Sequence, residues 1–193
     1  MKKYLKKYTY PFFESIRLVD GEPQLLDYHQ RRIDHVFKFA YPYIKPISLI
    51  DLTPSIAPKG ICKWRISYNQ SASTSSVELY EPQQIEKFVP VTCNISYPMK
   101  YTDRSIYTAM NQACDKDEVP LIITDDRLRE TNYGNIILKI DQVWYTPMYP
   151  IFYGVMRQYL IVNNLVTERD LFMKDFHDCD AIQMINAMRP PRF

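Results

Sequence analysis

The sequence lacks any apolar run long enough to span a membrane, and no apolar core follows its basic start. We therefore expect neither a transmembrane helix nor a secretory signal. The 193 residues carry a formal net charge of only +2, and the lysines and arginines are scattered, which argues against a nucleic-acid partner. The exception is the lysine-rich segment 2–7, which we expect to be a solvated terminal segment. Together these absences favour a cytoplasmic protein without a membrane or nucleic-acid partner.

Cysteine and glycine are also scarce, with four residues of each type. The cysteines are widely spaced, with no C-x-x-C pair and no histidine at ligand spacing, which argues against a metal site and a disulfide framework. With so few glycines, we expect each one where the backbone requires it. No G-x-G-x-x-G or Walker sequence occurs. The 16 tyrosines are many, and they indicate amphipathic packing or an extensive subunit interface.

The first half of the chain mixes strand and helix patterns. An alternating stretch ends at Val19, and Asp20-Gly21 predicts a hairpin turn. Asp27 is a suitable N-cap for a helix whose apolar face includes Ile33, Val36 and Phe37 and which Pro42 ends. Further along, alternation predicts a strand over 61–68, a loop over 70–76 and a returning strand over 77–80.

The second half follows a proline-bounded stretch, residues 82–98, which predicts a boundary between an N-terminal α+β domain (1–90) and a C-terminal domain (91–193). The patterns there predict helices near 106–113, from Gly154 and near 170–178, and strands near 119–124, 135–140, 143–146 and 181–187. Strands and helices do not alternate as regular βαβ units. The pattern therefore favours an α+β fold over a doubly wound sheet.

Four short segments occur in an order and spacing that resemble the functional segments of class IV aminotransferases, the fold type IV pyridoxal-phosphate enzymes. They are His29-Gln30-Arg31-Arg32, Lys100-Tyr101-Thr102-Asp103-Arg104, Glu130-Thr131-Asn132-Tyr133-Gly134-Asn135 and Tyr153-Gly154-Val155-Met156-Arg157-Gln158. The resemblance covers nearly the whole chain from Phe13 onward. It implies a fold like that of D-amino acid aminotransferase, with two small mixed domains, the cofactor site between them, and a homodimeric assembly.

The resemblance implies that Lys100 carries pyridoxal phosphate. The family's reactive lysine stands in a Lys-x-x-(Asn/Asp)-Arg setting, which Lys100 to Arg104 matches. The cofactor needs a lysine amine that is desolvated enough to lose its proton near neutral pH. Taken alone, the segment is more typical of a surface lysine at the start of a helix, and only the presence of the other three segments makes the catalytic interpretation the favoured one.

Glu130 is the second residue that the resemblance singles out. In the family a glutamate opens a Glu-x-x-x-x-Asn segment, and its carboxylate keeps the ring nitrogen of the cofactor protonated. Glu130 and Asn135 have this spacing, and Gly134 allows a close approach of the backbone to a ligand. The alternative is a solvated carboxylate in a turn.

For the cofactor phosphate, the resemblance implies that the backbone amides of Val155 and Met156 bind at the N-terminus of a helix. Arg32 would supply a bidentate cation. The alternative for Arg32 is an ion pair on the helix surface, although its place beside an apolar helix face argues against an unpaired charge. His29 is interpreted as structural, and Arg157 fits either role.

The last segment bears on which family member this is. Asn186-Ala187 followed by an apolar residue is similar to the aminodeoxychorismate lyase pattern, and both residues are expected at the cofactor. Ser15 falls where lyases place a hydroxyl near the reactive lysine, whereas Glu14 resembles the aminotransferase pattern. The resemblance therefore favours a lyase that releases pyruvate and leaves 4-aminobenzoate for folate synthesis.

Two departures from the family leave the substrate open. The segment before Phe13 is short, and the loop at 69–75, which carries an arginine in many lyases, has none. The remaining candidates to bind a substrate carboxylate are Arg17, Arg65 and Arg104, alongside Ser15. Besides the lyase, a D-amino acid or branched-chain transaminase and a non-catalytic cofactor-binding member remain as hypotheses.

Overall fold

The computed structural model describes residues 8–112 and 114–193, and the chain forms two compact units. Unit 1 comprises Met1–Glu81 and Met99–Asp103, and unit 2 comprises Pro82–Pro98 and Arg104–Phe193. The lysine-rich segment 2–7 lies outside the described residues. The domain boundary expected after residue 90 stays a prediction, because these units are defined by contacts, whereas a domain is defined by independent folding.

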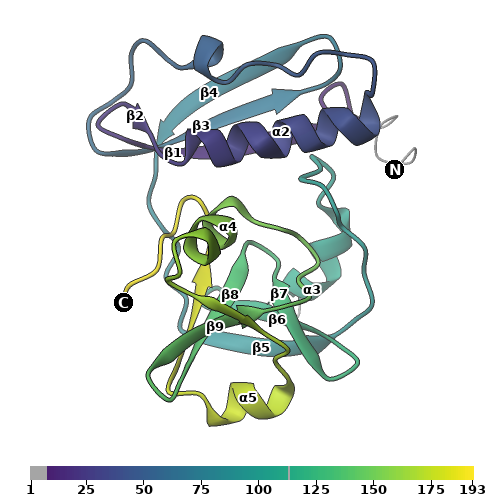
Figure 1. Cartoon of the computed structure of the whole chain (residues 1–193), viewed down its shortest axis with the longest axis vertical. Helices are drawn as coiled ribbons and strands as arrows, with labels where there is room; N and C mark the ends of the chain where they lie inside the picture. Colours follow the sequence, from purple (N-terminus) through teal and green to yellow (C-terminus); the bar gives the residue numbers. More distant parts are fainter. Residues whose placement is uncertain (1–7, 113) are drawn as a thin grey trace. The chain divides into compact units, whose positions relative to one another are not determined.

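Unit 1 is built on an antiparallel sheet in the strand order β2-β1-β3-β4. Its strands are β1 (Phe12–Val19), β2 (Glu22–Pro23), β3 (Ile61–Tyr68) and β4 (Ser73–Leu79). Helix α2 (Leu26–Ala40) lies along one face of this sheet, and a short 3₁₀ helix, η1 (Ile50–Leu52), follows in the connection to β3 (Figure 1). The expected apolar face of α2, with Ile33, Val36 and Phe37, is buried.

The alternation along β1 and β3 separates the two faces of the unit 1 sheet. Residues that face α2 are buried: Phe12, Glu14, Ile16, Leu18, Cys62, Trp64, Ile66 and Tyr68. The residues between them form the other face, which we call the polar face: Phe13, Ser15, Arg17, Lys63, Arg65 and Ser67. Except for Phe13, these side chains are half-buried. Side chains of β1 and β3 therefore lie either on the face that α2 covers, which we call the helix face, or on the polar face.

Unit 2 contains two sheets, in the strand orders β5-β6-β7 and β10-β9-β8-β11. The strands are β5 (Lys87–Thr92), β6 (Glu118–Thr124), β7 (Arg127–Thr131), β8 (Asn135–Ile140), β9 (Val143–Pro147), β10 (Thr167–Arg169) and β11 (Ala181–Ile185). The helices are η2 (Ser105–Tyr107), α3 (Thr108–Gln112), α4 (Val155–Val162) and α5 (Met173–Asp178). Their core is the buried cluster of Leu121, Ile123, Leu128, Ile136, Leu138 and Leu171.

Three tight hairpin turns share one backbone conformation, and the turn at Asp20-Gly21 lies where the sequence analysis predicts it. Asp20-Gly21, Asp125-Asp126 and Asp141-Gln142 all have positive φ at both central residues. Both central residues of a type I′ turn need this left-handed conformation, which aspartate tolerates better than most residues. The turns set the register of the hairpins β1–β2, β6–β7 and β8–β9.

The structure corrects four expectations about the secondary structure. Strand β4 begins at Ser73, inside the expected loop over 70–76, because its Ser and Thr residues pair with β3 at the edge of the sheet. Strand β5 lies within residues 82–98, for which the sequence predicts a boundary and no strand, and its Pro90 is tolerated because β5 is an edge strand. The sequence pattern does not predict strands β7 and β10, because both are short and rich in charged residues.

The start of α2 is the fourth correction. Leu25, in the left-handed conformation, precedes the helix, so Asp27 is not its N-cap. Asp27 instead lies in the first turn, where a negative charge still interacts favourably with the helix dipole.

Among the described residues, no helix combines the length and the apolar character needed to cross a membrane.

We predict that Leu138→Ala lowers the free energy of unfolding by about 2–5 kcal/mol, because it leaves a cavity in the unit 2 core where Leu138 is fully buried. Urea denaturation measures the change. The matched control is Val143→Ala on β9, whose side chain is 43% exposed, and it should alter stability by about 0.5 kcal/mol or less. Similar losses in both variants would contradict this description of the core.

Candidate functional site

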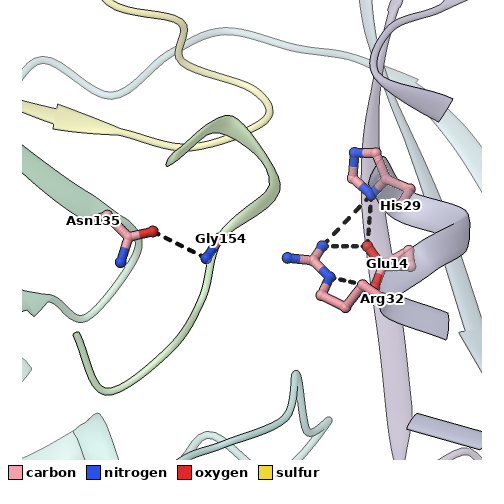
Figure 2. Close-up of polar contacts among 5 residues, drawn as sticks. All are labelled: Glu14, His29, Arg32, Asn135 and Gly154. Atoms are coloured by element: carbon pink, nitrogen blue, oxygen red, sulfur yellow. Dashed lines mark hydrogen bonds and ion pairs between the residues drawn. The ribbon is translucent and has the colours of Figure 1, made fainter. Parts of the chain in front are cut away.

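A buried carboxylate joins β1 to α2 in unit 1. Glu14 lies on the helix face of the sheet, and His29 and Arg32 are one turn apart on the facing side of α2. His29 Nδ1 lies 2.7 Å from Glu14 Oε2, and Arg32 Nε donates to Glu14 Oε1 at 2.8 Å. Arg32 Nη2 donates to Glu14 Oε2 as well, so the guanidinium binds the carboxylate through two nitrogens (Figure 2). We call these three residues the Glu14 cluster.

The charges within the Glu14 cluster are set by its surroundings. Burial raises the pKa of Glu14, but the charge of Arg32 and hydrogen bonds from His29 and Arg32 outweigh it and lower the pKa to about 2. Burial likewise lowers the pKa of His29. A neutral His29 beside an ionised Glu14 must donate from Nδ1, which leaves Nε2 unprotonated. Within the described residues, His29 Nε2 is buried and has no hydrogen-bond partner.

This arrangement bears on the expected role of Arg32. The Nε edge of its guanidinium is engaged by Glu14, so a contact with a phosphate would use the opposite edge. The alternative interpretation of Arg32 as an ion-pair residue agrees with this contact, but the pair is not on the surface, because the Arg32 side chain is only 11% exposed and its partner is fully buried. His29 is fully buried and takes part in the cluster, as a structural interpretation requires.

Lys100 belongs to unit 1 through the short segment Met99–Asp103, which runs along β1. The Phe13 N–H donates to the Lys100 carbonyl at 3.1 Å, and Thr102 Oγ1 donates to the Tyr10 carbonyl at 2.6 Å. The Lys100 amine lies 5.0 Å from the centroid of the Phe13 ring, which places it on the polar face of the sheet. Lys100 is half-buried there.

Ser15 and Arg17 follow Phe13 at alternate positions of β1, so both also lie on the polar face. Arg104 belongs to unit 2. Its guanidinium carbon lies 4.4 Å from the centroid of the Tyr107 ring, and the group donates to the Asn132 carbonyl. Of the four candidate substrate residues, Ser15, Arg17 and Arg65 share the polar face with Lys100.

Unit 2 contains a second buried carboxyl group, on β7. Glu130 is 3% exposed, and its Oε2 accepts the Phe152 N–H at 2.7 Å. Burial raises the pKa of Glu130 to about 8, and the backbone hydrogen bonds only partly offset this effect. Near neutral pH the group therefore holds a proton. The alternative of a solvated turn carboxylate is wrong for this position.

Asn135, at the start of β8, holds the loop that leads into α4. Its Nδ2 donates to the Phe152 carbonyl at 2.8 Å. Its Oδ1 accepts the Gly154 N–H at 3.1 Å (Figure 2). A longer contact of 3.4 Å joins Nδ2 to Glu130 Oε2. A Cβ atom at Gly154 would collide with Asn135 Oδ1, so this position requires glycine. We call Asn135, Phe152 and Gly154 the amide clamp.

The amide clamp positions the N-terminus of α4, which begins at Val155. Within the described residues, no side chain caps this end of the helix. Val155 and Met156 are buried, and their amides are among the N–H groups that a helix leaves without an internal partner. Arg157 has a structural role, because its buried guanidinium donates to the Pro147 carbonyl at 2.8 Å and to Glu168 at 2.5 Å.

Asn186 and Ala187 lie in the turn after β11. Asn186 Oδ1 accepts the N–H groups of Met188 and Arg189, and its Nδ2 donates to the Tyr133 carbonyl at 3.1 Å. The side chain therefore stabilises the turn, and the expected contact of both residues with a cofactor stays a prediction. The sequence does not predict that the Phe152 N–H donates to Glu130, because every residue except proline carries a backbone N–H group.

Residues 93–192 match the model of the amino-transferase class IV family. The chain belongs to this family. A Haemophilus influenzae protein without an assigned function is 33% identical over 189 residues, which cover 93% of this chain and 98% of the relative.

Two solved structures have the same fold. A proposed 4-amino-4-deoxychorismate lyase from Haemophilus somnus is 26% identical, with a TM-score of 0.87, and the match covers 95% of this chain and 99% of the other. A hypothetical aminotransferase from Mycobacterium tuberculosis, solved with α-ketoglutarate and PMP, is 16% identical, with a TM-score of 0.72 over 95% of this chain and 83% of the other. These findings confirm the α+β fold of the fold type IV enzymes.

The family makes this chain a pyridoxal-phosphate-dependent enzyme that acts on a small molecule. The described residues fit the cofactor in two respects. Glu130 is a buried, proton-bearing carboxyl group of the kind that a pyridine nitrogen needs, and α4 offers an uncapped N-terminus of the kind that a phosphate needs. Asn135 contacts both groups, because its Nδ2 approaches Glu130 Oε2 and its Oδ1 accepts the N–H of Gly154, directly before α4.

We predict that the cofactor-free protein loses stability through Glu130 as the pH rises from about 4.5 to about 8. The folded state holds the Glu130 proton over this range, whereas the unfolded state releases it, so the slope is roughly 1.4 kcal/mol per pH unit. Glu130→Gln removes the titration, and the difference between wild type and variant isolates it from other groups. Urea unfolding across this range measures that difference. Glu22→Gln, at an exposed position, is the matched control.

A stability difference that stays flat between these pH values would show that Glu130 is ionised in the folded protein.

Proposed function

We propose that this protein is a 4-amino-4-deoxychorismate lyase, which converts its substrate to 4-aminobenzoate and pyruvate in folate synthesis. The observation that carries the proposal is the placement of Lys100 and Ser15 on one face of the unit 1 sheet. Lyases of the family resemble this chain in placing a hydroxyl near the reactive lysine. The likeness to the Haemophilus somnus structure supports the same activity.

Pyridoxal phosphate is the proposed cofactor, and Lys100 is its attachment point. Glu130 would meet the ring nitrogen, while the Val155 and Met156 amides and Arg32 would hold the phosphate. Asn135, Asn186 and Ala187 complete the proposed cofactor set. When bound, the cofactor supplies an electron sink for the bonds that break next to the substrate amine.

The protein's own groups would contribute in distinct ways. The Lys100 amine acts as the base and acid that moves a proton between substrate atoms. Glu130 carries into the site the proton that the ring nitrogen requires, because burial keeps its carboxyl group protonated near neutral pH. The amide clamp fixes the α4 amides relative to Glu130, so the groups for the ring and for the phosphate are preorganised in unit 2.

A D-amino acid or branched-chain transaminase is the second candidate. Glu14 favours it, because this glutamate resembles the aminotransferase pattern, and here it is fully buried against Arg32 and His29. The Mycobacterium tuberculosis structure, named as an aminotransferase, has the same fold. The two activities differ in whether the substrate eliminates pyruvate or transfers its amine to a keto acid.

The activity assay distinguishes these candidates. We predict that protein loaded with pyridoxal phosphate releases pyruvate and 4-aminobenzoate in equal amounts from 4-amino-4-deoxychorismate. Lys100→Ala should lower the rate by roughly 10²–10⁴-fold or more and abolish the lysine adduct that borohydride traps, as measured by intact mass. Lys63→Ala, on the same face, is the matched control and should keep the adduct.

Amine transfer to a keto acid without pyruvate elimination would replace the lyase by the transaminase. An adduct that persists in Lys100→Ala would overturn the assignment of the lysine.

We also propose that the chain acts as a homodimer in the cytoplasm, as the family resemblance implies. We predict that light scattering on the purified enzyme gives the mass of two chains. An active enzyme with the mass of one 23.0 kDa chain would contradict this proposal.

A further inference from the structure

The turn that joins β7 to β8, residues 132–134, separates Glu130 from Asn135. Thr131 closes this turn: its N–H donates to the Gly134 carbonyl at 2.8 Å, and its Oγ1 accepts the Gly134 N–H at 3.0 Å. Thr131 directly follows Glu130 on β7. The contacts that hold the turn therefore also hold the buried carboxyl group that is proposed to meet the cofactor ring.

Two side chains from the segment before β6 hold the β7–β8 turn. The Arg104 guanidinium donates to the Asn132 carbonyl. The Asn132 side chain is buried, and its Nδ2 donates to Asn111 Oδ1 on α3. Asn132 is thus bound through both its backbone and its side chain, which fixes the turn to the segment 104–112.

Three tyrosine rings surround the Arg104 guanidinium. Its central carbon lies 4.4 Å from the centroid of Tyr107, 5.6 Å from that of Tyr97 and 5.8 Å from that of Tyr133. Tyr97 and Tyr107 are each 2% exposed, and they pack edge to face with their centroids 5.1 Å apart. Ring faces attract a cation but do not neutralise its charge. The rings therefore give the guanidinium a defined place and leave it fully charged.

The half-buried guanidinium of Arg104 also differs from its neighbours in its ionic partners. Within residues 8–112 and 114–193, no carboxylate forms an ion pair with Arg104. By contrast, Arg127 on β7 lies 2.9 Å from Asp170. A cation that is partly removed from water and lacks a counter-charge acts on other ionisable groups more strongly than a paired cation at the surface does.

Glu130 is the carboxyl group that responds to this charge. Burial raises the pKa of Glu130, whereas backbone hydrogen bonds and then the charges of Arg129 and Arg104 lower it. Tyr107 also lies in this electrostatic environment, but burial raises its pKa, so the phenol stays neutral. Arg129 is the neighbour of Glu130 on β7 itself, at the point where the β6–β7 register shifts. Arg104 is thus the cation that another segment of unit 2 supplies.

We infer that Arg104 is a positioning residue for Glu130, because it holds the β7–β8 turn through the Asn132 carbonyl and supplies a positive charge without a carboxylate partner. The inference rests on the proposed function, in which Glu130 meets the ring nitrogen. A carboxyl group that passes its proton to a base needs its ionised form stabilised, and a cation provides this stabilisation. Burial opposes ionisation of Glu130, and Arg104 keeps this carboxyl group able to release its proton near neutral pH.

The test follows the protonated Glu130 carboxyl group in the cofactor-free protein, through the infrared absorption of its C=O bond as the pH is raised. Glu130→Gln lacks this band and so assigns it. The wild-type midpoint should lie at about 8. Arg104→Gln removes the charge and keeps a donor for the Asn132 carbonyl. It should raise the midpoint by roughly 0.5–1 pH unit, because the ionised carboxylate loses an attractive charge.

Arg104→Lys keeps the charge and should keep the wild-type midpoint. Arg127→Gln is the matched control, because Arg127 lies on the same strand as Glu130 and its charge is paired with Asp170. The midpoint should not move in this variant. Arg104→Met, which keeps an unbranched side chain among the tyrosine rings, is the second neutral variant and should show the same rise as Arg104→Gln.

A wild-type midpoint in both neutral variants would overturn the inference and leave the lysine adduct, and with it the proposed function, intact. Equal rises in Arg104→Lys and Arg104→Gln would also overturn the inference, because the shift would then follow from a disturbed turn and not from the charge. A wild type without the lysine adduct would overturn the proposed function, whatever the titration of Glu130 shows.

Discussion

The side-chain amide of Asn135 is the constraint on which the organisation of unit 2 depends. It satisfies a carbonyl and an N–H group of the chain entering α4, and it also approaches Glu130. Backbone groups in a buried loop must find partners, and a single amide side chain with one donor pair and one acceptor meets this need. Asn135 is the first residue of the buried strand β8. Its hydrogen bonds therefore fix the loop before α4 to the sheet.

Two buried glutamates differ in charge near neutral pH because their surroundings differ. Glu14 is fully buried, yet Arg32 and His29 supply charge and hydrogen bonds that keep it ionised. Glu130 is almost as buried, but its main partners are neutral backbone N–H groups, so desolvation prevails and the carboxyl group keeps its proton. One carboxylate thereby fixes a helix to a sheet, and the other remains available as a proton carrier.

Much of this architecture is predictable from the sequence, and the exceptions have physical causes. The alternation in Ile61–Tyr68 and the Asp-rich turns predict their elements correctly, because burial and left-handed backbone restrict the residue types. Strands β5 and β7 escape prediction because their pairing is supplied by β6, whose contribution is not local in sequence. The pairing of Glu14 with Arg32 is equally non-local, although Glu14, His29 and Arg32 each stood out individually.

The contact between Gly154 and Asn135 also limits how this chain can change over evolutionary time. Any side chain at position 154 would occupy the space of the Asn135 amide oxygen, and any shorter side chain at position 135 would leave two backbone groups without partners. A single substitution at either position is therefore deleterious while the other residue stays. We therefore expect relatives that keep this loop to retain asparagine at position 135 and glycine at position 154 together.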